Sequence, residues 1–96
     1  MIQSSGLKGT SAVICNVPCN YWGCKLVADS GKTPLLTIYD SNNSTTTGKV
    51  EVGYEKSSDT LTMGGQVLSR PVRCFNGIYA ALSAAEGDYI VYYEII

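Results

Sequence analysis

Residues 88–96 read DYIVYYEII and carry apolar side chains on both faces of an extended strand. The side chains of one face are Tyr89, Val91, Tyr93 and Ile95, and those of the other are Ile90, Tyr92 and Ile96. An exposed strand of this composition would template aggregation. We therefore expect it to lie centrally in a sheet with both faces covered, or to form a subunit contact as well, through Tyr89, Tyr92, Tyr93 and Ile96.

Other segments upstream show the same period-two alternation, separated by clusters of Gly, Pro, Asn, Asp and Ser, which is typical of many short strands. They are Ser11–Asn16, Cys24–Ala28, Leu35–Asp40, Lys49–Glu55, Leu61–Met63, Gln66–Leu68, Val72–Phe75 and Ile78–Leu82. The pairs Gly64-Gly65, Asn76-Gly77 and Glu86-Gly87 are expected to form turns. The pattern predicts an all-β fold, a compact antiparallel β-sandwich or jelly-roll-like domain of about eight short strands.

The length of the chain, 96 residues, is that of one ordinary domain. Residues 1–10 are polar and contain Gly, so we expect an N-terminal arm there, and its composition is compatible with a flexible segment. Residues 11–96 form the single predicted β domain. The polar run 41–48, SNNSTTTG, has no apolar residue to bury and is expected to be an exposed loop.

Charge and hydropathy narrow the range of partners. Seven Lys and Arg against eight Asp and Glu give a net charge of −1, without a basic cluster, so no nucleic acid partner is expected. The apolar stretches are far shorter than the roughly 18 residues of a membrane span, so no membrane partner is expected. The opening residues do not read as a secretory signal, and we expect synthesis in the cytoplasm.

The four cysteines are Cys15, Cys19, Cys24 and Cys74. Their spacing does not open with the two-residue gap usual in zinc sites, and no His accompanies them. Buried free thiols are the favoured interpretation, because free Cys is among the most buried residue types. One or two disulfides formed later, outside the cell, are the main alternative. No metal or other cofactor is expected.

The absence of His also bears on catalysis, because it removes the commonest general base and the usual partner of a Ser or Cys nucleophile. A catalytic Cys needs a base or a cation beside it. Lys25 follows Cys24 and Arg73 precedes Cys74, but adjacent residues on a strand point to opposite faces. We therefore expect that the chain is not an enzyme.

Two aromatic residues, Tyr21 and Trp22, lie between Cys19 and Cys24 in a stretch that looks rich in turns. An exposed aromatic pair could contact a sugar or a protein partner. A single Trp in a small β domain more often fills the core, and this is the favoured interpretation of Trp22.

The segment 71–79, PVRCFNGIY, followed by the final strand, resembles the ending of a class of small tailed-phage virion proteins. The segment 36–40, LTIYD, with its polar loop and Gly48-Lys49-Val50, is similar to the same class. Together these pieces cover residues 35–96, about two thirds of the chain. The Cys-rich segment 15–24 departs from that pattern.

The resemblance implies a capsid decoration or cement protein with a β-sandwich or jelly-roll-like fold, often a homotrimer. Such a protein binds neighbouring subunits of the major capsid protein on the surface of the virion. It needs no active site, which agrees with the composition. The alternative is a carbohydrate- or receptor-binding module of a phage fibre or tail, with Tyr21 and Trp22 as the stacking surface.

Overall fold

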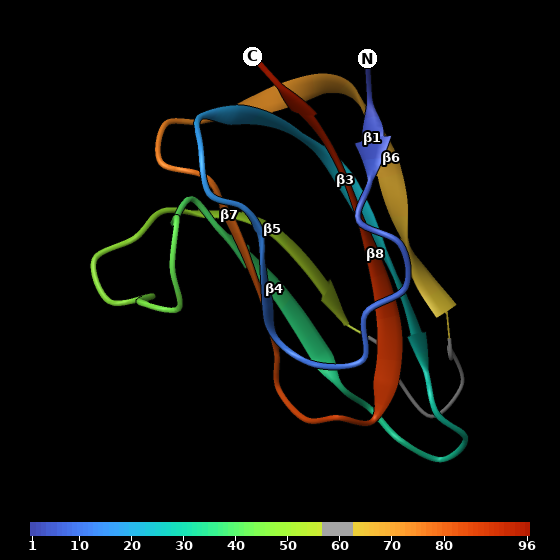
Figure 1. The fold of residues 1–96 in the computed structure, drawn as a ribbon. Coiled ribbons are helices and arrows are strands. Elements are labelled where there is room, and N and C mark those ends of the chain that lie inside the picture. Colours follow the sequence, from blue (N-terminus) through green and yellow to red (C-terminus); the bar gives the residue numbers. More distant parts are fainter. Residues whose placement is uncertain (57–62) are drawn as a thin grey trace.

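The computed structural model describes residues 1–56 and 63–96, and these residues form two packed antiparallel sheets (Figure 1). The predicted all-β sandwich is confirmed, and no helix that could cross a membrane occurs in these residues. The strands of the described part are β1 (Gln3–Ser4), β2 (Ala12–Cys15), β3 (Cys19–Ala28), β4 (Leu35–Tyr39), β5 (Glu51–Lys56), β6 (Met63–Cys74), β7 (Ile78–Leu82) and β8 (Gly87–Ile95).

Sheet A has the strand order β1-β8-β3-β6, and sheet B has the order β2-β7-β4-β5. Strands β2 and β3 follow one another in the chain but belong to different sheets, so the turn between them crosses from one layer to the other. Both termini lie at the end of the sandwich where β3 begins and β6 ends (Figure 1). Chain segments far apart in sequence therefore meet at that end.

The core lies between the sheets and follows from the alternation of apolar residues. In β4, Leu36 and Ile38 are fully buried, and Leu26 of β3 and Ile78 of β7 meet them from the two sheets. Burying each such side chain stabilises the fold by roughly 1.5–3 kcal/mol relative to leaving it exposed. The two sheets are thus held together mainly by this apolar layer.

The central position predicted for the final strand is confirmed, because β8 pairs with β1 on one side and β3 on the other. Residues 1–10 run along its outer edge. The backbone N–H of Ser5 donates to the Val91 carbonyl at 2.9 Å, and Lys8 exchanges two such bonds with Tyr89. The expected arm therefore lies against sheet A and covers one edge of β8.

The hairpin predicted around Gly64-Gly65 is wrong. Both glycines lie inside the long strand β6, opposite Leu26 and Lys25 of β3. A Cβ atom at Gly65, whose φ is +122°, would lie 2.6 Å from the Lys25 Cα. Glycine therefore permits the close approach of two strands here. The strand expected at residues 61–63 falls partly outside the described residues.

Strand β5 is less buried than its alternation predicts. The alternation in residues 49–55 predicts that Val50, Val52 and Tyr54 share one covered face. Val52 packs against the core, while Val50 and Tyr54 are 66% and 53% exposed. A register shift between Ile38 and Tyr39, opposite β5, changes the alternation there. Because β5 is also the last strand of sheet B, little covers it.

Candidate functional site

An open groove lies between the end of β2, the turn that follows it, and the last residues of β8. Its volume is about 400 Å³, and it contains no charged side chain. The residues that line it are Val13, Ile14, Cys15, Asn16, Val17, Tyr93 and Ile95. The groove can therefore take an uncharged group, and its volume is in the range of sites for small molecules.

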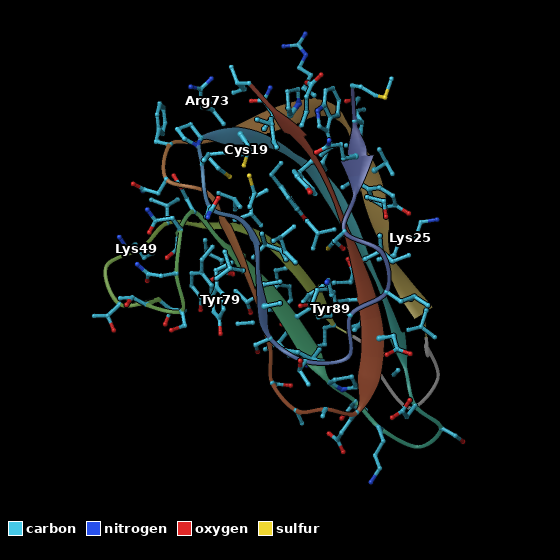
Figure 2. All side chains as sticks on the ribbon, viewed as in Figure 1. Cys19, Lys25, Lys49, Arg73, Tyr79 and Tyr89 are labelled. Carbon is cyan, nitrogen blue, oxygen red and sulfur yellow. The ribbon has the colours of Figure 1, made fainter. Side chains whose placement is uncertain are left out.

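Exposed apolar side chains occur on the segments that meet at the end of the sandwich where the termini lie, and two of them, Val17 and Ile95, also line the groove. Phe75 in the β6–β7 turn is 71% exposed, with the Arg73 guanidinium 5.6 Å from the centre of its ring. Figure 2 shows Arg73 and Cys19 at this end. We call this set the apolar end; its members are Met1, Ile2, Val17, Val72, Phe75, Ile95 and Ile96.

Three of the four cysteines gather beneath the apolar end. A bulge in β2 after Val13 precedes Cys15, which points to the interior, and Cys19 begins β3 directly opposite Cys74 of β6. All three thiols are free, and their residues are at most 6% exposed. Cys24 is also free and buried, but lies further along β3, beside Tyr21.

Burial keeps the inner thiols protonated. The pKa of Cys74 is raised to about 12, by burial first and then by the nearby Asp40 carboxylate and the Cys15 thiol. The pKa of Cys19 is raised well above its ordinary value by burial first and then by a hydrogen bond with Cys15. The pKa of Cys24 is raised by burial too. Because the thiolate is the nucleophile, these groups react slowly at neutral pH with reagents that come from solution.

We expect Cys74 and Cys19 to resist alkylation of the native protein. At pH 8, a pKa of about 12 leaves a thiolate fraction about a thousandfold lower than that of an unperturbed thiol. Iodoacetamide at pH 8, followed by peptide mass spectrometry, should label Cys15 at the groove first. Equal labelling of all four cysteines in the native protein would contradict this, and the protein unfolded in urea is the control.

Asp40 organises the turn below Phe75, and sequence reasoning gave it no role. Its buried carboxylate accepts hydrogen bonds from the backbone N–H groups of Phe75, Asn76 and Gly77, at 3.0, 2.8 and 3.4 Å. The available signal was an Asp at the end of a strand, a residue type that often bonds to backbone N–H groups in turns. Asp40 thus fixes the position of the β6–β7 turn in the apolar end.

The structure separates Tyr21 from Trp22. Both residues belong to strand β3, whereas a turn-rich stretch was expected here. Their side chains therefore project from opposite faces of the sheet. Tyr21 is 3% exposed and points into the sandwich, where Gly53 of β5 leaves room for its ring. Trp22 is half-buried. Tyr21 therefore offers no surface to a partner, which corrects that expectation.

The four residues expected in a subunit contact do not share one surface. Tyr89 is 1% exposed, and its hydroxyl donates to the Thr10 carbonyl at 2.7 Å (Figure 2). Tyr93 also packs against the core and lines the groove, while Tyr92 faces the other way and is half-buried. Ile96 is 62% exposed and belongs to the apolar end. Burial removes Tyr89 from any contact surface.

Among the described residues, no group of three or more His, Cys, Asp or Glu side chains is arranged to hold a metal ion. Comparison with protein-family models, curated proteins and solved structures found no match for this chain.

Proposed function

We propose that the chain is a structural protein of a bacteriophage particle, which decorates or cements the capsid by binding neighbouring subunits of the major capsid protein. The observation that carries this proposal is the apolar end. Clustered apolar side chains on the surface of a small domain commonly mark protein–protein contacts. The sequence resemblance of residues 35–96 supplies the identity of the partner.

The composition of this surface supports assembly over catalysis. Phe75 and Arg73 are residue types enriched in protein interfaces, and here they stack on one another at the rim. The groove beside them is uncharged, so burying it against a partner leaves no ion without a counter-charge. Binding to an assembled lattice would stabilise that lattice by mass action. We propose a homotrimer on the capsid surface as the working form.

The alternative, a carbohydrate- or receptor-binding module of a fibre or tail, required exposed stacking by Tyr21 and Trp22. Tyr21 is buried, and Trp22 is covered in part. A sugar-binding platform needs an accessible aromatic face. The capsid proposal is therefore favoured over this alternative.

Replacing Val17 with Lys should weaken binding to capsids at least about tenfold, because a charge would be buried in an apolar contact. The matched control is Val27→Lys, since the two valines are 41% and 42% exposed. Val27 lies near the far end of β3, roughly 25 Å from Cys19. Its substitution should leave binding unchanged.

Co-sedimentation with shells assembled from the major capsid protein of the same genome would measure this binding. Circular dichroism would verify that both variants are folded. Light scattering of the free protein would show whether it has three times the 10.3 kDa mass of the chain. A wild-type protein that stays in the supernatant at every ratio would refute the proposed function, and equal effects of the two substitutions would refute the assigned surface.

A further inference from the structure

Cys15 and Cys19 stand on either side of the crossing between the two sheets. Cys15 ends β2 in sheet B, and Cys19 begins β3 in sheet A, with Asn16, Val17 and Pro18 between them. Both side chains point into the same end of the core, where both residues belong to the buried apolar cluster. A bond between their sulfur atoms would therefore connect one layer of the sandwich to the other.

Of the two, Cys15 is the one that can be reached from outside. It is 6% exposed and lines the groove, and its Sγ donates to the Val17 carbonyl at 3.4 Å, on the groove wall. Cys19 has no exposed surface. A reagent that enters the groove meets Cys15 first, with Cys19 immediately behind it.

We propose that Cys15 and Cys19 form an oxidisable dithiol, which closes to a disulfide when the uncharged S–S segment of a small disulfide such as oxidised glutathione reaches Cys15 at the open groove. The disulfide staples sheet A to sheet B beneath the apolar end. This inference concerns the chain itself and is independent of the proposed function.

The reaction is two successive thiol–disulfide exchanges. Cys15 loses its proton, its sulfur attacks one sulfur of the oxidant, and the S–S bond of the oxidant breaks to release one glutathione thiolate, which takes up a proton. Cys19 then loses its proton and attacks the Cys15 sulfur, which releases the second glutathione thiolate in the same way. Two protein thiols are oxidised and one oxidised glutathione is reduced to two glutathione molecules.

The other cysteines are less suited to this bond. Cys74 faces Cys19 across β3 and β6 but is fully buried, with its Sγ 3.9 Å from the Val72 carbonyl oxygen, and it does not line the groove. Cys24 interacts with the Tyr21 hydroxyl and is separated from Cys19 by four residues of β3. The order of access therefore favours Cys15 with Cys19.

The test is to incubate the native protein with millimolar oxidised glutathione, alkylate the remaining thiols under denaturing conditions, and digest with trypsin. Cleavage after Lys8, Lys25 and Arg73 puts Cys15, Cys19 and Cys24 in the peptide 9–25 and Cys74 in the peptide 74–96. We expect a peptide 9–25 that is 2 Da lighter than its dithiol form and is alkylated on Cys24 alone. Peptide 74–96 should carry an alkylated Cys74.

The remaining outcomes overturn the proposal. A cross-linked pair of the two peptides would assign the bond to Cys74, fragments with an alkylated Cys15 or Cys19 would assign it to Cys24, and four alkylated cysteines would show that no bond forms. Closing a short loop should also raise Tm by about 5 °C, and dithiothreitol should reverse this. Cys15→Ala should abolish the rise, whereas the matched buried control, Cys24→Ala, should keep it.

Discussion

Replacing Gly77 with Ala is expected to lower the free energy of unfolding by more than about 3 kcal/mol. The new methyl group would clash with backbone atoms, which cannot move aside as the end of a flexible side chain can. Gly77 has a φ of +149° and is the last residue of the β6–β7 turn. A Cβ atom there would meet the Cys15 carbonyl oxygen and lie 3.2 Å from the Ser41 carbonyl oxygen. These two atoms belong to β2 and to the loop after β4, so relief would require two segments to move.

The matched control is Gly48→Ala. Gly48 also has a positive φ, +75°, but a Cβ atom there would meet nothing within 4 Å. This variant should lose only the conformational term, about 1–2 kcal/mol. Urea unfolding followed by the fluorescence of Trp22 measures both. Equal losses would show that the contact of Gly77 with β2 does not matter and that φ alone sets its cost.

The alternation of apolar residues was sufficient to predict the fold class and most strands, because burial between two layers imposes period two. It could not distinguish a glycine pair in a turn from one in a strand. Gly64-Gly65 and Asn76-Gly77 have similar local chemistry, yet the first lies against β3 and the second in a turn. The difference lies in what approaches each pair from elsewhere in the chain.

The candidate site was predictable in part. The preference of free Cys for the interior led to the correct expectation of burial for all four thiols. The arrangement of Cys15, Cys19 and Cys74 at one end depends on the pairing of β3 with β6, which no local pattern specifies. Tyr21 and Trp22 were treated as a pair in a turn, and their separation follows directly once they lie on a strand.

Replacing Asp40 with Ala should lower the free energy of unfolding by about 2–4 kcal/mol, because three backbone N–H groups would lose their acceptor. The N–H groups of Asn76 and Gly77 both donate to the same carboxylate oxygen, Oδ1 of Asp40. The turn carries Phe75, so the same change should weaken binding at the apolar end. Urea unfolding and co-sedimentation measure the two effects separately.

Two further variants, Asp40→Asn and Asp88→Asn, distinguish the loss of the hydrogen-bond acceptor at Asp40 from the mere removal of a negative charge. In Asp40→Asn, the amide oxygen can still accept from Asn76 and Gly77, but the amide nitrogen would face the N–H of Phe75, so an intermediate loss is expected. Asp88→Asn removes the same charge from an exposed residue and should change stability by less than about 0.5 kcal/mol. If Asp40→Ala changed the free energy of unfolding as little as Asp88→Asn, the Asp40 carboxylate would not be the group that holds the β6–β7 turn. The position of Phe75 would then have to depend on the backbone contacts of Gly77 alone.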